Sequence, residues 1–124
     1  MEFKIDTKNS YTLLTPVTNA INANLTGAIS QKMEELGQSV SSNLILDCCN
    51  CSKIEDSAFE ALKQLHEDFY SSSCSLVFIN LQPRILEAFR INNEGIDINI
   101  APTLVEAIDI VNMEILERDL LNEE

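Results

Sequence analysis

The chain has few of the residues that enzymes and nucleic-acid-binding proteins concentrate at their sites. Its 124 residues include three glycines, one histidine, and eight basic residues against twenty acidic ones. So few glycines leave neither a Gly-rich loop that would cradle a phosphate group nor a Gly-x-Ser-x-Gly elbow. The net charge of −12 opposes binding to nucleic acid and to anionic membrane surfaces. We therefore expect no nucleic-acid partner.

Long apolar runs are also missing. No stretch approaches the roughly 20 apolar residues that a membrane-spanning helix needs, so we expect no membrane insertion. The first six residues, Met-Glu-Phe-Lys-Ile-Asp, are not typical of a signal peptide. The composition predicts a cytoplasmic protein of one domain, long enough to bury a single hydrophobic core.

The single histidine, His66, argues against a serine hydrolase triad that would use Ser57. Both residues lie on one predicted helix, about 13 Å apart along its axis, so the imidazole cannot reach the hydroxyl. Glu55 and Asp56 offer oxygen ligands for Mg²⁺, but two adjacent carboxylates are usually only a solvated helix entry. We expect no enzyme activity and no cofactor.

Four cysteines invite a metal or redox interpretation: Cys48, Cys49, Cys51 and Cys74. Adjacent residues of a strand point to opposite faces, so Cys48 and Cys49 cannot both face one ion unless the strand breaks. The only histidine lies well downstream of them. We therefore predict four reduced, metal-free thiols that fill the core.

The stretch from Leu44 to Leu62 organises the rest of the chain. It is nearly all apolar up to Asp47, which is typical of a strand buried on both faces. From Phe59 onward, apolar residues recur at helical spacing. Between these halves Ser57 stands three residues before Glu60. This Ser-x-x-Glu pattern is that of a capping box and predicts a helix that starts at Ser57.

The other segments give the remaining elements. The N-terminal strands at residues 3–7 and 11–15 form a hairpin, and the helix after them ends at Gly37. Strands at 76–81 and 96–100 follow, with a short helix from Pro83 between them. A second capping box, Thr103-x-x-Glu106, opens the last helix. The order ββαβαβαβα predicts an α/β fold with a mixed sheet of about five strands and about four helices. The predicted core includes Leu46, Cys48, Phe59, Leu62, Val77 and Ile79.

The last helix is longer than a single domain needs. We divide the chain into a domain at 1–112 and an acidic C-terminal extension of this helix at 113–124, which we expect to be dispensable for folding but to contribute to association. Several apolar residues lie partly off the face that the core can use, and some of them should be exposed: Val105, Met113, Leu116 and Leu120.

One pattern within the organising stretch resembles a known family. Residues 46–59 read Leu-Asp, six further residues, and then Ile-Glu-Asp-Ser-Ala-Phe. This run resembles, without a gap, the signature of STAS domains (sulfate transporter and anti-sigma factor antagonist). The resemblance continues through Leu76 to Leu86 and implies a STAS-like single domain.

The resemblance also implies a function. Ser57 matches the serine that anti-sigma kinases phosphorylate in anti-sigma factor antagonists. The chain is thus expected to be a bacterial phosphoprotein of transcription regulation, bound by a kinase-like anti-sigma factor. Glu55, Asp56 and Ala58 depart from the usual aspartate, serine and glycine of the family. The expected partner-binding residues are Asn19, Glu55, Asp56, Ser57 and Gln82.

Two other interpretations stay open. The second is a STAS subunit that has lost the switch and serves in a larger complex, such as a lipid-transport ABC system or a signalling assembly. A third, more remote interpretation is a module that binds a small molecule with the loops that carry the expected partner-binding residues. The sequence names neither the partner nor the oligomeric state, so a dimer is also left open.

Overall fold

The computed structural model describes residues 1–92 and 98–122, and it contains a five-stranded sheet in the order β1-β2-β4-β6-β7. Strand β1 pairs antiparallel with β2, and every other neighbouring pair is parallel. The strands are β1 (Phe3–Thr7), β2 (Thr12–Pro16), β4 (Leu44–Asp47), β6 (Leu76–Ile79) and β7 (Asn99–Ala101). The predicted mixed sheet with an N-terminal hairpin is confirmed.

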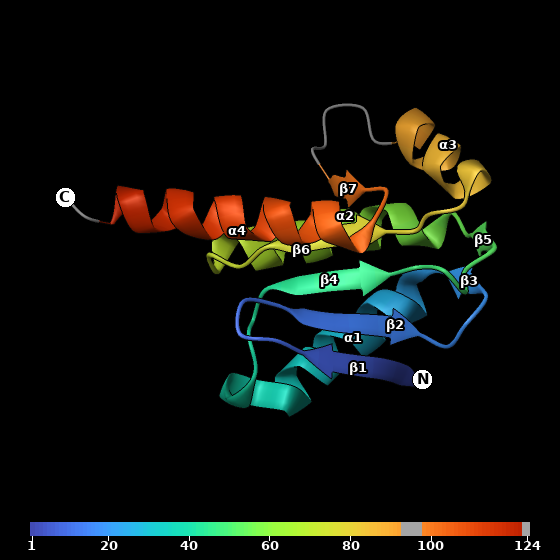
Figure 1. Cartoon of the computed structure of the whole chain (residues 1–124). Coiled ribbons are helices and arrows are strands. Elements are labelled where there is room, and N and C mark those ends of the chain that lie inside the picture. Colours follow the sequence, from blue (N-terminus) through green and yellow to red (C-terminus); the bar gives the residue numbers. More distant parts are fainter. Residues whose placement is uncertain (93–97, 123–124) are drawn as a thin grey trace.

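Helices cover both faces of this sheet (Figure 1). They are α1 (Ala23–Leu36), α2 (Ser57–Ser71), α3 (Pro83–Asn92) and α4 (Leu104–Leu121), with a short 3₁₀ turn η1 (Gly37–Ser39) after α1. Helices α1 and α2 pack on one face, and α4 crosses the other face and extends past its edge. The predicted strand and helix order is confirmed. Two short strands, β3 (Ala20–Ile21) and β5 (Lys53–Ile54), were not predicted and form a separate parallel pair.

The core is divided in two by the sheet. Along β4, Leu44 and Leu46 pack into the cluster beneath α1 and α2, while Ile45 packs into the cluster beneath α4. All three are fully buried, because a strand in the middle of the sheet has a helix layer on each side. This arrangement explains why the strand segment carries no polar side chain before Asp47.

Most of the predicted core is buried, with one exception. Leu46, Cys48, Leu62, Val77 and Ile79 are at most 1% exposed. The prediction for Phe59 was wrong: it is only half-buried and packs edge-on against Phe89, with ring centroids 6.1 Å apart. Phe59 lies on the first turn of α2, and Phe89 belongs to the short helix α3.

The two predicted capping boxes had different outcomes. Thr103 caps α4, and its side chain accepts a hydrogen bond from the Glu106 N–H. Ser57 does not cap α2: it is the first helical residue, and the cap position belongs to Asp56, whose side chain makes no capping hydrogen bond. The prediction that Gly37 ends α1 is confirmed, because Gly37 has a φ of 62° and its N–H bonds to the Met33 carbonyl.

The strand predicted at 96–100 is shorter in the structure. Its described part, β7, begins at Asn99 and forms the edge of the sheet beside β6. The first two positions of the predicted strand, 96 and 97, lie outside the described residues. The predicted half-exposed edge strand is therefore confirmed from Asn99 onward.

Polar side chains fasten α4 to the rest of the domain. Glu114 accepts a hydrogen bond from the Tyr70 hydroxyl at 2.8 Å and another from the Asn99 amide at 3.0 Å. One turn later, the Arg118 guanidinium donates to Ser75 Oγ and Asn43 Oδ1, both at 3.2 Å. The division at residue 113 stays a prediction, but a truncation there would remove these contacts. None of the helices in the described part of the chain is long and apolar enough to cross a membrane.

Candidate functional site

The side chain of Ser57 lies where two helices begin. Its hydroxyl oxygen accepts a hydrogen bond from the backbone N–H of Ala23, the first residue of α1, at 3.4 Å. Ser57 is itself the first residue of α2 and is exposed. An exposed hydroxyl therefore stands at the N-termini of α1 and α2, both of which carry partial positive charge from their unpaired N–H groups.

Asn22 connects the two helix starts a second time. Its Oδ1 caps α1 by accepting from the Leu25 N–H at 3.0 Å, and its Nδ2 donates to Glu55 Oε2 at 3.1 Å. The backbone N–H of Glu55 also bonds to the Ile21 carbonyl at 2.9 Å. The link between Asn22 and Glu55 is a feature that no pattern in the sequence indicated.

The short β3–β5 pair holds this arrangement together. Ala20 pairs with Lys53 and Ile21 with Ile54, so the loops before α1 and α2 run side by side. At the start of the pair, the Asn19 carbonyl accepts from the N–H groups of Ser52 and Lys53. The predicted site residues Asn19, Glu55 and Ser57 are thus brought together, although no sequence pattern indicated the pairing.

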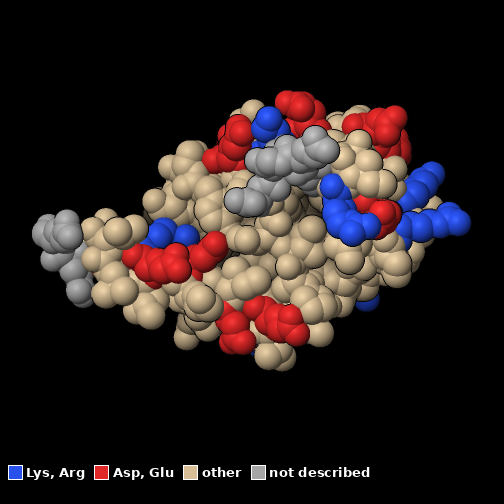
Figure 2. Space-filling view, turned by 90° about the horizontal axis from the view of Figure 1, so that it is seen from above, with Lys and Arg blue, Asp and Glu red and all other residues tan. Residues whose placement is uncertain are grey.

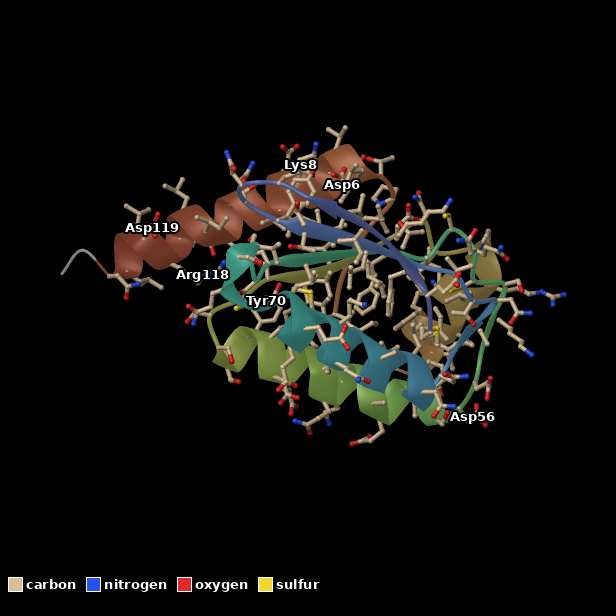
Figure 3. The ribbon with its side chains drawn as sticks, turned by 90° about the horizontal axis from the view of Figure 1, so that it is seen from below. Asp6, Lys8, Asp56, Tyr70, Arg118 and Asp119 are labelled. Atoms are coloured by element: carbon tan, nitrogen blue, oxygen red, sulfur yellow. The ribbon has the colours of Figure 1, made fainter. Side chains whose placement is uncertain are left out.

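Acidic groups oppose the positive ends of the helices. Glu55, Asp56 and Glu60 are all exposed, and all lie within three positions of Ser57. The Asp56 carboxylate makes none of the side-chain hydrogen bonds found among the described residues. Figure 3 shows Asp56 at the edge of the molecule, away from Tyr70 and Arg118. An incoming phosphate would be attracted by the helix N-termini and repelled by these carboxylates.

Gln82 lies apart from this cluster. It is exposed and precedes α3, where its carbonyl accepts from the Leu86 N–H at 2.9 Å. Helix α3 contacts β5, so Gln82 belongs to the same end of the sheet (Figure 1). No hydrogen bond described in the structure joins its side chain to the group around Ser57. The structure thus places Gln82 near this surface without connecting the two.

A second polar group joins the ends of β4 and β6. Asp47 Oδ1 accepts from the Cys49 N–H and from the Asn80 side-chain amide, both at 3.0 Å. Asn80 has a φ of 58°, a left-handed conformation that asparagine tolerates better than most residues. This carboxylate therefore shapes the two loops at the carboxyl ends of the central strands.

Two of the cysteines form a pair below this surface. The Cys51 N–H bonds to the Cys48 carbonyl at 3.0 Å, which makes a turn, and both side chains are fully buried. The hydrogen bond between the two thiols raises the pKa of Cys48, as does its burial, and lowers the pKa of Cys51. Two residues separate Cys48 from Cys51, and this Cys-x-x-Cys spacing, which the sequence analysis missed, is the signal for the pair.

Neither the thiols nor the carboxylates make a metal centre in the part of the chain that is described. Residues 1–92 and 98–122 contain no group of three or more histidine, cysteine, aspartate or glutamate side chains that would hold an ion. Cys49 is exposed, whereas its neighbour Cys48 is buried. The two thus face in different directions, as expected for adjacent residues at the end of a strand.

A sheet with helices on both faces and an exposed serine at a helix start defines a small α/β module with a polar surface at one end. The model of the STAS domain family matches residues 3–121. The chain therefore belongs to the STAS domain family, and the resemblance of residues 46–59 to its signature is confirmed. No curated protein is similar enough in sequence to count as a relative.

Solved structures share the fold at low sequence identity. A candidate anti-sigma factor antagonist from Thermotoga maritima superposes with a TM-score of 0.72 at 14% identity, covering 89% of this chain and 94% of its own. SpoIIAA, an anti-sigma factor antagonist solved in its unphosphorylated form, gives 0.61 at 14% identity, with 90% and 98% covered. The murine Solute Carrier 26 family member A9, an anion transporter, gives 0.70 at 15% identity, but the match covers 86% of this chain and only 18% of the transporter. These likenesses show the fold.

Proposed function

We propose that this protein is a regulatory, protein-binding STAS module that acts as an anti-sigma factor antagonist. Its partner is a kinase-like anti-sigma factor in the cytoplasm of a bacterium, and the contact surface contains Asn19, Glu55, Asp56, Ser57 and Gln82. The observation that carries this proposal is the position of Ser57, exposed between the N-termini of two helices that are held together by Asn22. The module binds and does not catalyse.

Phosphorylation of Ser57 is the proposed switch. A phosphate adds about −1.5 to −2 charges at neutral pH. The N–H groups at the start of α1 would stabilise this negative charge by donating hydrogen bonds to it, since the Ala23 N–H already donates to the Ser57 oxygen. Glu55 and Asp56 would add to the negative field that the partner meets. The phosphorylated surface would therefore repel a partner that docks on the neutral form.

A second candidate function is that of a subunit without a switch. The three carboxylates near Ser57 favour it, because they make a phosphate less stable here. The structural likeness to part of an anion transporter supports it as well, since the matched part is 18% of a larger transport protein. In this alternative the chain serves a larger complex, such as a lipid-transport ABC system or a signalling assembly, and Ser57 is only part of a constant interface.

The test compares partner capture by three forms of the protein in its native host, followed by mass spectrometry of the partners and of Ser57. We expect wild-type protein to capture a kinase-like partner, and Ser57→Glu to lose most of it. Ser42→Glu is the matched control: Ser42 is also exposed but precedes β4, at the opposite end of the sheet. Equal capture by wild type and Ser57→Glu, with Ser57 always unmodified, would favour the subunit without a switch.

A further inference from the structure

Five large apolar side chains of α4 are exposed, and all but Leu121 share one side of the helix. The exposed fractions of these four are 69% for Val105, 61% for Met113, 59% for Leu116 and 59% for Leu120. An α-helix advances about 100° per residue, so these positions fall within an arc of about 80°. The buried residues Ala107 and Val111 lie on the opposite side of the helix. We call these four exposed residues the α4 stripe, and their predicted exposure is confirmed.

Buried apolar residues and polar contacts on its inner side together hold the orientation of α4. Arg118 donates to Ser75 Oγ, and Glu114 accepts from the hydroxyl of Tyr70. Ser75 is fully buried, so a rotation that broke its contact with Arg118 would leave polar atoms unsatisfied. Turning the α4 stripe inward would therefore cost free energy, and the stripe is a fixed feature of the surface.

Acidic side chains border the α4 stripe. Asp109 lies within its arc, and Glu106, Glu117 and Asp119 lie beside it; all four are exposed. Arg118, the only basic residue of α4, is directed inward. Figure 2 shows uncharged surface towards the free end of α4, with acidic groups and one basic group behind it, and in Figure 3 Arg118 lies nearer α2 than Asp119 does. The outer face of α4 is thus apolar from Met113 to Leu120, while Asp109 stands between Val105 and Met113 and the other acidic residues lie beside the stripe.

We infer that the α4 stripe docks a helix of another protein, one that carries an apolar seam bordered by lysine or arginine. Met113, Leu116 and Leu120 follow the spacing i, i+3, i+7, which is that of a seam between two helices. Basic borders on the partner would face the acidic borders of α4 and speed the encounter. A second copy of this chain would bring acidic borders together, so the geometry points to a different protein.

The size of the α4 stripe sets the strength of the contact. It presents a few hundred Å² of apolar surface, which is less than one side of a standard stable interface. The contact by itself therefore belongs to the weak or transient class of interfaces. The free end of α4 and the Ser57 surface lie at opposite ends of the molecule (Figure 1, Figure 3). The inference is thus independent of the function proposed above.

Synthetic peptides test this inference on the full-length protein. The first is a 21-residue amphipathic helix with leucine along one seam and lysine beside it. The second keeps the seam but replaces lysine with glutamate, and the third has the composition of the first in scrambled order. Binding is measured by fluorescence anisotropy at low and high salt. We expect the lysine-bordered helix to bind at least tenfold more tightly than either other peptide, and more weakly at high salt.

Variants locate the binding site. Met113→Gln with Leu116→Gln keeps good helix formers and removes the apolar surface, and it should weaken binding of the first peptide at least tenfold. Ile91→Gln, at another exposed helical position, should leave binding unchanged, and so should Ser57→Glu. Equal binding of the first and scrambled peptides would overturn the inference, as would a dimer in analytical ultracentrifugation that the double substitution dissolves.

Discussion

The hydroxyl oxygen of Ser57 and the backbone N–H of Ala23 are joined by a hydrogen bond of 3.4 Å across 34 positions of sequence. This contact ties the first turn of α2 to the first turn of α1. Asn22 and Glu55 repeat the link beside it at 3.1 Å. A change in charge at Ser57 would therefore act on the N-termini of both α1 and α2, as a switch at this surface requires.

The first prediction concerns the cap of α1. Asn22→Ala removes the acceptor of the Leu25 N–H and the donor to Glu55, so we expect a loss of about 1 kcal/mol in the free energy of unfolding. Urea denaturation measures it. Asn24→Ala, at an exposed position in the same turn, is the control and should change stability by less than about 0.5 kcal/mol. Equal losses would show that Asn22 has no special role.

The second prediction concerns the fastening of α4. Arg118→Met keeps an apolar stem but removes the guanidinium that contacts Ser75 and Asn43. Because Ser75 is buried, we expect a loss of about 1–3 kcal/mol. Arg90→Met on α3, where the arginine is exposed, should cost less than about 0.5 kcal/mol. If both variants unfold at the same urea concentration, Arg118 does not fasten the helix.

The third prediction is a dependence on alkaline pH. Burial, and after it the hydrogen bond to Glu114, raises the pKa of Tyr70 to about 12. A tyrosine in the unfolded chain has a pKa of about 10. The unfolded state therefore releases its proton first, and the stability that the neutral phenol contributes is fully present below pH 10 and is lost as the pH rises towards 12.

Tyr70→Phe isolates this effect from other groups. Between pH 9 and 11 the wild type should lose about 1 kcal/mol more than Tyr70→Phe, a figure reduced because the phenol is only half-buried. Urea unfolding at several pH values gives the two curves. Parallel curves over this range would mean that the phenol of Tyr70 titrates equally in the folded and unfolded states.

The fourth prediction concerns the thiols, which we expect to be reduced and metal-free. Cys49 is exposed and Cys74 half-exposed, whereas Cys48 and Cys51 are buried. In native protein a thiol reagent should therefore modify Cys49 first and Cys74 next, and should reach the other two only on unfolding. Cys49→Ser should remove the fastest phase. Stoichiometric zinc in protein purified without added metal would contradict the expected absence of a metal.

Local patterns determined most of the elements. The apolar run before Asp47, the capping box at Thr103 and the stop at Gly37 each depend on neighbouring residues alone, and all three were predicted correctly. At Ser57 the same local reasoning predicted the start of α2 correctly but its cap wrongly, because Ser57 is the first helical residue and Asp56 holds the cap position. The Ser57 hydroxyl oxygen instead accepts from the Ala23 N–H, 34 positions away in sequence, and no local pattern indicates this contact.

The sequence by itself determined the fold class, the family and the serine at the start of α2, because periodicity, caps and a signature are properties of short stretches of chain. Only the tertiary structure decided what surrounds that serine and which groups hold α4 in place. Pairing of β3 with β5 brought Asn22 to Glu55, and α4 is held by the contact of Arg118 with Ser75. Both contacts join groups that are far apart in sequence and come together only when the sheet has formed, so no local sequence pattern predicts them.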